Sequence, residues 1–551
     1  MEKRGARSFD NLSQRYLKSF LKHNPEFGAN WGIKGCFFKP NSFSKRAIFS
    51  ECNDTELIYS QLKRIDVNSL GKDEYIDYLV LKGGLERDIY DMTHSEERAI
   101  MSPGDYLPFF GLDTLIERDT PQIAKKMLFR IKDAKKTLPQ AIERLREESL
   151  FMPPEWISSA VNICEDGHIF LNDIFRYDGI GNSKLYKELK VEVNELEKAL
   201  SDYQYFLEGE LSSCANGSFG CGRERFELEL SSTHFLDLSP EEIHAFGVKL
   251  FKDTHSELEE LVSGDMLSYN SMLKRNPLSK NRIFEFYHEH SENLLGFLQE
   301  NDLVSLDVEQ ELEISHINRH LTRLFPFAAY SAPPIYGEQL GNFLINVHSK
   351  ESRAEQTYSF MRSTAAHEGY PGHHLQFSLA NLIARERPSS WIRALNESST
   401  MYEGWAMYTE QLMVEEGFHN FKSDKFLLLK DRLWRALRVQ LDVDLHLNDL
   451  SYSEASDRMV SELGFSPEVA EMDLDWYIEY PGMPMGYAVG WKMINLLRDY
   501  EMDRTGSNFS LRNFHDKLLS QGSIALPLVI ETAFSKKALK TVYSEFRDYI
   551  K

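Results

Sequence analysis

The feature that most constrains the fold is the spacing of apolar residues, which recur every three or four positions through most of this 551-residue chain. This spacing is typical of amphipathic α-helices, and residues 73–92, 121–150 and 184–211 show it clearly. Strand-like alternation is rare, and its best example is "GNFLINVHS" at 341–349. The sequence therefore predicts a mainly α-helical protein with a small β element.

A stretch rich in glycine and serine, "LSSCANGSFGCGRERF" at 211–226, predicts a boundary within the chain. We expect an N-terminal helical lobe at 1–220 and a second helical lobe at 221–551, the two forming one integrated unit. Ser239, with Glu242 three residues later, predicts the start of a helix shortly after this boundary.

Charge and hydropathy exclude some classes of partner. The chain has 63 basic and 85 acidic residues, a net charge of −22, which repels nucleic acid and anionic lipid. A run of about 18 apolar residues, as a membrane span requires, does not occur, and the N-terminal segment lacks the apolar centre of a secretory signal. We therefore expect a cytoplasmic protein without a membrane partner, and its oligomeric state stays open.

The segment "HEGYPGHH" at 367–374 resembles an altered zinc-binding motif. Two histidines at positions i and i+4 of a helix lie about 40° apart and about 6 Å along the axis, so they can share one zinc ion. Here position i+4 from His367 is Pro371, so the usual second ligand is missing. On a straight helix, neither His373 nor His374 reaches the same ion as His367.

The Pro371–Gly372 pair offers a way around this spacing. Proline lacks a backbone donor and glycine tolerates unusual dihedral angles, so a bulge in the helix can absorb two residues. His373 then takes the position of the second ligand. The alternative is a kinked helix that ends at Pro371 and binds no metal.

A third ligand is expected from a second helix, for which residues 395–417 are the candidate. This segment offers Glu397, Glu403 and Glu410, and the last two lie on one face because they are seven residues apart. Carboxylates on a helix rich in Trp and Met are costly to bury without a cation, which favours a metal over a solvated acidic surface. The residues alone do not choose among the three.

Together with "YEGWAMYTE", "RVQLDVDLH" and "YPGMPMGYAVGWKMI", the motif "HEGYPGHHLQ" resembles the bacterial family known as domain of unknown function 885. The resemblance covers roughly residues 50–545. The family is similar to gluzincin metallopeptidases, so the resemblance implies a mostly helical, two-lobed zincin-type fold with a deep cleft and one zinc ion per chain.

The resemblance also implies roles for individual residues. His367, His373 and Glu403 correspond to the zinc ligands, and Glu368 corresponds to the general base. Other candidates are Tyr487 and His446 as catalytic donors, and His374, Glu410, Asp442 and Asn346 as residues that support the metal or contact substrate. Asn346 belongs to the expected strand, which either pairs as an edge strand with an extended substrate or is a buried structural strand.

These features predict a zinc-dependent hydrolase that cleaves peptide or peptide-like amide bonds in short substrates. The alternatives are an enzyme that tailors a natural product at a non-peptide amide, and a catalytically inactive binding protein of the same fold. Two departures from the family pattern, Asp444 and the Met483–Pro484 pair, are expected near the cleft and leave the substrate preference open.

Overall fold

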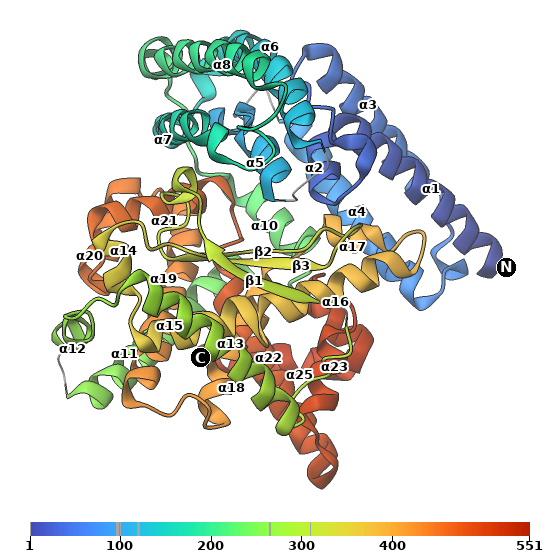
Figure 1. Ribbon diagram of the computed structural model, residues 1–551. Coiled ribbons are helices and arrows are strands. Elements are labelled where there is room, and N and C mark those ends of the chain that lie inside the picture. The colour runs from blue at the N-terminus through green and yellow to red at the C-terminus, as the bar shows by residue number, and fades with distance from the viewer. Residues whose placement is uncertain (1, 95–98, 100, 118–121, 264–265, 309) are drawn as a thin grey trace.

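A computed structural model describes residues 2–94, 99, 101–117, 122–263, 266–308 and 310–551, and these residues form a mainly helical protein. The first part of the chain lies at the top of Figure 1. Its helices are α1 (Glu2–His23), α2 (Pro25–Asn30), α3 (Lys45–Leu62), α4 (Lys72–Thr93), α5 (Phe109–Glu117), α6 (Ile123–Glu148), α7 (Pro154–Asp173), α8 (Tyr186–Phe206) and α9 (Ser212–Cys214). The helices α4, α6 and α8 match the three apolar patterns within a few residues.

The rest of the chain surrounds a small sheet at the centre of Figure 1. Its first helices are α10 (Gly222–Ser232), α11 (Pro240–Val262), α12 (Met266–Leu273), α13 (Lys280–Glu300), α14 (Lys350–Glu355), α15 (Tyr358–Thr364), α16 (His373–Glu386) and α17 (Trp391–Leu395). They are followed by α18 (Ser399–Glu415), α19 (Lys422–Leu447), α20 (Tyr452–Leu463), α21 (Pro467–Glu479), α22 (Gly486–Thr505), α23 (Leu511–Leu519), α24 (Leu526–Val529) and α25 (Lys536–Ile550). The expected capping box of Ser239 and Glu242 is present at the start of α11.

The sheet has three strands, β1 (Glu311–His316), β2 (Ala328–Ser331) and β3 (Leu340–Ile345), in the order β1-β3-β2. β3 is the strand that the sequence predicted, and it pairs with β1 in parallel and with β2 in antiparallel orientation. The expectation that this strand forms an edge open to substrate is therefore wrong, because both of its sides are occupied. β2 is the edge strand nearest the predicted metal-binding segment.

Asn346, expected to contact substrate, instead fixes the end of β3. Its side-chain amide donates to the carbonyl oxygens of Thr322 and Phe325 at 3.3 and 3.1 Å, and its carbonyl oxygen accepts from the backbone of His348 at 3.2 Å. A buried amide bonded in this way has a structural role.

The hydrophobic interior does not follow the boundary expected at residue 220. One cluster of buried side chains joins α1, α3 and α4 to helices of the last third of the chain, and the other joins α5–α8 to α19–α21. The long helix α19 contributes to both clusters, with Val439 in the first and Leu437 in the second. Burying one such apolar side chain contributes about 1.5–3 kcal/mol, so the two ranges stabilise each other.

Two helices of the predicted site, α18 and α22, cross at very short range. Added at Gly404, a Cβ atom would lie 2.7 Å from the backbone of Gly490, and one at Gly490 would lie 2.0 Å from the carbonyl oxygen of Thr400. Glycine at both positions therefore permits a crossing that places Glu403 of α18 beside the start of α22.

Candidate metal centre

The segment that carries the first histidines is distorted as the Pro–Gly pair predicts. His367 lies in a π-helical turn, Ala365–Gly369, that continues α15, and α16 begins again at His373. A Cβ atom at Gly372 would lie 1.9 Å from the carbonyl oxygen of His367, so only glycine permits this close approach. The turn and the irregular residues after it bring His373 next to His367, with the two rings 4.7 Å apart.

Helix α18 contacts backbone carbonyl groups of the distorted segment. The indole nitrogen of Trp405 donates to the carbonyl oxygen of Pro371 at 2.9 Å. The hydroxyl of Thr409 lies 3.1 Å from the carbonyl oxygen of Ala366. The helix that offers the third ligand therefore also holds the segment carrying the first two.

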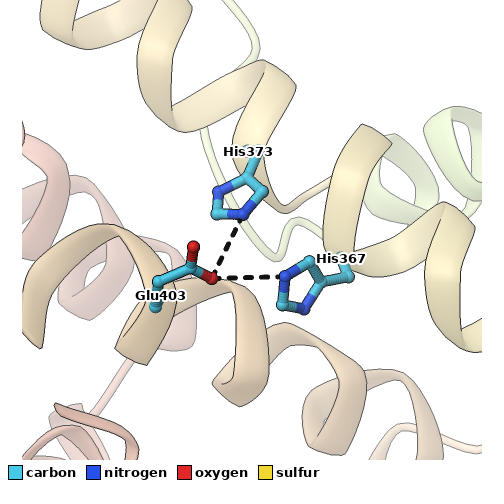
Figure 2. A group of neighbouring side chains, drawn as sticks. All are labelled: His367, His373 and Glu403. Atoms are coloured by element: carbon cyan, nitrogen blue, oxygen red, sulfur yellow. Dashed lines mark ion pairs between the residues drawn. The ribbon is translucent and has the colours of Figure 1, made fainter. Parts of the chain in front are cut away.

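His367, His373 and Glu403 point toward one another from these two segments (Figure 2). The Oε2 atom of Glu403 lies 3.4 Å from the Nε2 atom of each histidine. Tetrahedral zinc with bonds of about 2.0–2.1 Å separates its ligand atoms by about 3.4 Å, so these distances match those of a zinc-binding site. All three residues are buried, and the Oε2 atom of Glu403 has no hydrogen-bond partner among the described residues.

Glu410, two helical turns after Glu403 on α18, orients the first histidine. Its Oε1 atom accepts a hydrogen bond from Nδ1 of His367 at 2.7 Å, which leaves Nε2 directed at Glu403. Glu410 also accepts from Ser363 at 3.2 Å and from Arg435 of α19 at 3.4 Å. Neither Ser363 nor Arg435 was singled out in the sequence, although Ser363 precedes His367 by one helical turn.

The electrostatics of the cluster reflect a surplus of carboxylates. Burial lowers the pKa of His367, but Glu403 and Glu410 outweigh it and raise this pKa to about 10. Glu368 is partly exposed. Desolvation by the surrounding protein nevertheless raises its pKa above the usual value, although the two histidines act in the opposite direction. A carboxyl group with a raised pKa beside the cluster is suited to accept and return a proton.

Tyr487, at the start of α22, lies beside the third ligand. Burial and the carboxylate of Glu403, to which its phenol is hydrogen-bonded, raise its pKa well above the usual value, so the phenol stays neutral. The guanidinium of Arg438 lies 4.7 Å from the centre of its ring. Asp442 accepts hydrogen bonds from the backbone of Gly482 and Met485 and so holds the turn that leads to Tyr487.

The structure does not bring His446 to this cluster. Its Nε2 atom is 3.0 Å from the carbonyl oxygen of Tyr477, and its Nδ1 atom accepts from the backbone nitrogen of Cys221 at 3.4 Å. The catalytic role expected for His446 does not fit this placement, because both ring nitrogens bind backbone groups. Asp444, also expected near the cleft, forms ion pairs with His244 and Arg458 instead.

His374, the residue after the second ligand, connects the metal-binding segment to the sheet. Its Nδ1 atom lies 3.0 Å from the phenol oxygen of Tyr330 in β2, and burial lowers its pKa to about 4. The ring of Tyr330 also stacks at 6.3 Å on that of His373. Tyr330 was missed in the sequence because the strand β2 is too short to show alternation.

A cavity of about 780 Å³ lies beside the cluster. Tyr330 and Phe377 form part of its wall, and the ring of Phe377 is 5.6 Å from that of His373. Glu397, the alternative third ligand, also lines this cavity and lies outside the cluster. The residues that line the cavity do not include the three cluster residues, and the wall residues Tyr330 and Phe377 lie against His373.

A mainly helical fold with a buried His–His–Glu cluster on two crossing segments defines the class of this protein. The sequence profile of a family described as "Bacterial protein of unknown function (DUF885)" matches residues 25–532, and the chain belongs to this family. A comparison with curated proteins found no match.

Two solved structures share the fold. One, from Shewanella oneidensis, is described as "a putative lipoprotein of unknown function"; it is 18% identical, with a TM-score of 0.73, over 95% of this chain and 98% of the other. The second, described as "the putative lipoprotein from Colwellia psychrerythraea", is 16% identical, with a TM-score of 0.81, over 99% of both chains. Within the described ranges, no helix has the length and apolar content to cross a membrane.

Proposed function

We propose that this protein is a zinc-dependent hydrolase of peptide or peptide-like amide bonds in short substrates. The observation that carries the proposal is the convergence of His367, His373 and Glu403, whose ligand atoms all lie within 4.8 Å of one another. Two imidazoles and one carboxylate are a typical ligand set for catalytic zinc, with one position left for water or substrate.

Zinc bound by these residues supplies a Lewis acid that polarises a carbonyl group and lowers the pKa of a bound water molecule. The residues of the chain perform the other steps. Glu368 takes a proton from the attacking water and passes it to the departing nitrogen. The neutral phenol of Tyr487 would exchange its hydrogen bond to Glu403 for one to the carbonyl oxygen as negative charge develops on that oxygen.

β2 is suited to hold an extended substrate. It is an edge of the sheet, and Ala329, Tyr330 and Ser331 line the cavity. Main-chain hydrogen bonds to such a strand are independent of substrate side chains. We therefore propose for β2 the pairing with substrate that was one of the two alternatives for the strand at 341–349.

The test combines elemental analysis with a library of dipeptides and tripeptides. We expect about one zinc ion per chain and cleavage of a subset of the library. Glu368→Gln should retain zinc and lower kcat by about 10²–10⁴-fold, because it removes the proton acceptor. Glu386→Gln, at an exposed position at the end of α16, is the matched control and should leave kcat unchanged.

Two outcomes would contradict the proposal. A purified protein that binds no zinc even after incubation with the ion would exclude the metal centre. A zinc-loaded protein that cleaves no member of the library would exclude peptide hydrolysis and favour the tailoring of a different amide.

A further inference from the structure

The cavity beside the metal centre has a strongly acidic wall. It lies between residues of the first 170 positions and residues after 320, so both parts of the chain contribute to it. Its lining includes eight carboxylates, which are Glu26, Asp105, Asp113, Glu117, Asp166, Glu397, Asp475 and Glu479. Arg323 is the one arginine or lysine among the lining residues, and it forms an ion pair with Glu165 at 2.8 Å.

Some of these carboxylates have cationic or imidazole partners within the protein. Glu26 pairs with Arg130 at 3.0 Å, and Asp113 lies 3.1 Å from Nε2 of His320. Such pairs explain why an acidic side chain is buried and call for no ligand. Three of the other carboxyl groups interact with one another instead.

Asp105, Asp475 and Glu479 form a group that makes no ion pair among the residues that the structure describes; Arg323 faces Asp475 but is paired with Glu165. Asp105 lies in a short 3₁₀ helix, Pro103–Tyr106, whereas Asp475 and Glu479 are one turn apart on α21. Burial, followed by repulsion from Asp105 and Asp475, raises the pKa of Glu479 to about 8, although Ser102 opposes the shift. Burial also raises the pKa values of Asp105 and Asp475 to about 6.

Hydrogen bonds within the protein satisfy only some of the oxygen atoms of these three carboxyl groups. Asp105 accepts from the backbone of Ser102 at 3.0 Å as the end of a capping box, and Asp475 accepts from the phenol of Tyr452 at 2.8 Å. The Oε1 atom of Glu479 is buried and has no hydrogen-bond partner within the described ranges. A buried carboxylate oxygen without a donor is costly, which points to a donor that arrives with a ligand.

We propose that Asp105, Asp475 and Glu479 recognise an ammonium or guanidinium group of the substrate, so that the enzyme acts on short cationic peptides or amides. This inference rests on the proposed function, because the cavity lies beside the metal centre, with Phe377 and Tyr330 of its wall against the ring of His373. A metal ion is not the expected occupant. Within the described part of the chain, only the His367, His373 and Glu403 set has ligand atoms close enough to share one.

Each end of the cavity binds a different part of the substrate. Near the metal centre, the amide that is to be cleaved lies against β2. The acidic group binds a positive charge elsewhere on the same molecule, and charge-assisted hydrogen bonds to a dry carboxylate are about twice as strong as neutral ones. Since the three residues come from both parts of the chain, a bound cation also joins the 3₁₀ helix to α21.

The test measures binding in the zinc-loaded Glu368→Gln variant, which is expected to turn over its ligand about 10²–10⁴-fold more slowly than the wild type. Probes are acetylated and amidated tripeptides of alanine that carry one lysine, norleucine or glutamate at each position in turn. Isothermal titration calorimetry should show at least one lysine peptide that binds about tenfold more tightly than its norleucine counterpart. The glutamate peptides should bind most weakly.

Proton release provides a readout that a merely structural role would not change. A cation beside Glu479 lowers its pKa from about 8, so at pH 7 the carboxyl group gives up a proton. The binding enthalpy of the lysine peptide should therefore depend on the ionisation enthalpy of the buffer, and that of the norleucine peptide should not. Tyr480, which also faces this group, stays neutral at this pH, because burial raises the pKa of its phenol.

Two substitutions then locate the effect. Glu479→Gln and Asp475→Asn should each reduce the lysine preference to about twofold or less and leave norleucine binding unchanged. Glu468→Gln removes the same charge from an exposed position on α21 and should preserve the preference. Unchanged binding of the norleucine peptide shows that the variants are folded.

Equal binding of lysine and norleucine peptides to the parent protein, or no binding of any lysine peptide, would overturn the inference. A lysine preference that survives Glu479→Gln and Asp475→Asn would overturn the assignment to these residues. If lysine peptides bind as expected but the wild-type enzyme with zinc cleaves none of them, the proposed function fails while the cation site stands.

Discussion

Two buried pairs of histidines in this protein have opposite surroundings. His367 and His373 face Glu403, and the first also binds Glu410. His290 of α13 and His419, after α18, face each other instead, with their Nε2 atoms 3.0 Å apart.

The second pair lies among aromatic rings. Phe286 stacks on His290 at 5.2 Å, and Phe418 lies 5.3 Å from the same ring. Burial lowers the pKa of both His290 and His419 to about 3, whereas the carboxylates raise that of His367 to about 10. Proximity of two imidazoles is thus common to both pairs, and a third, anionic donor distinguishes the candidate metal centre from a packed pair.

The largest expected difference between the two histidine pairs is in their zinc content. Replacing one ligand by His373→Ala leaves two donors, so we expect zinc to fall from about one ion per chain to a trace after dialysis. His419→Ala is the matched control and should retain the full zinc content. Mass spectrometry of the metal content measures both. Equal zinc content in the two variants would show that His373 is not a zinc ligand.

The next effect concerns the neutral donor beside the cluster, which the aromatic pair lacks. Tyr487→Phe should lower kcat by about 10²–10³-fold with little change in KM and with zinc retained, because it removes a hydrogen bond to the developing oxyanion. Tyr500→Phe, on the same helix α22, controls for loss of a phenol. Steady-state kinetics on a cleaved tripeptide provide the measurement. A Tyr487→Phe enzyme with normal kcat would exclude this role.

A smaller effect concerns the carboxylate behind His367. Glu410→Gln keeps an acceptor for Nδ1 but removes the charge, so we expect zinc affinity to fall by about 10–100-fold. Competition with a chromophoric chelator measures the dissociation constant. Glu416→Gln, exposed at the end of α18, should not change it. Unchanged affinity in Glu410→Gln would mean that the hydrogen bond alone orients the ring.

Local chemistry explains which parts of this site could be predicted from sequence. The distortion after His367 follows from Pro371 and Gly372, which are only a few residues away, and the π-helical turn is observed there. The seven-residue spacing of Glu403 and Glu410 likewise predicted a shared face, and both approach His367. Their separate tasks depend on how α18 crosses the broken helix, which no local pattern specifies.

The sequence-based predictions that were wrong concern residues whose surroundings depend on contacts between distant parts of the chain. The strand at 341–349 was recognised, but its central position depends on pairing with both β1 and β2, and β1 is joined to it by a long connection that includes β2. His446 looked suitable by residue type, yet the turn at Cys221 and the end of α21 occupy its ring. The acidic group in the cavity combines Asp105 with Glu479, which only the packing of the two parts of the chain brings together.

The smallest expected effect is on stability in acid, which depends on the aromatic pair His290 and His419. A histidine whose folded pKa is depressed contributes stability that is fully present above its unfolded pKa of about 6.5 and is lost as pH falls toward the folded value. For His419, with a folded pKa of about 3, the loss between pH 8 and pH 5 is about 2 kcal/mol. Urea unfolding should show that His419→Gln loses about that much less stability than the wild type over this range, because glutamine does not titrate. His288→Gln, exposed on the same helix as His290, should behave like the wild type, and an equal acid sensitivity in His419→Gln would show that the pair is already protonated when folded.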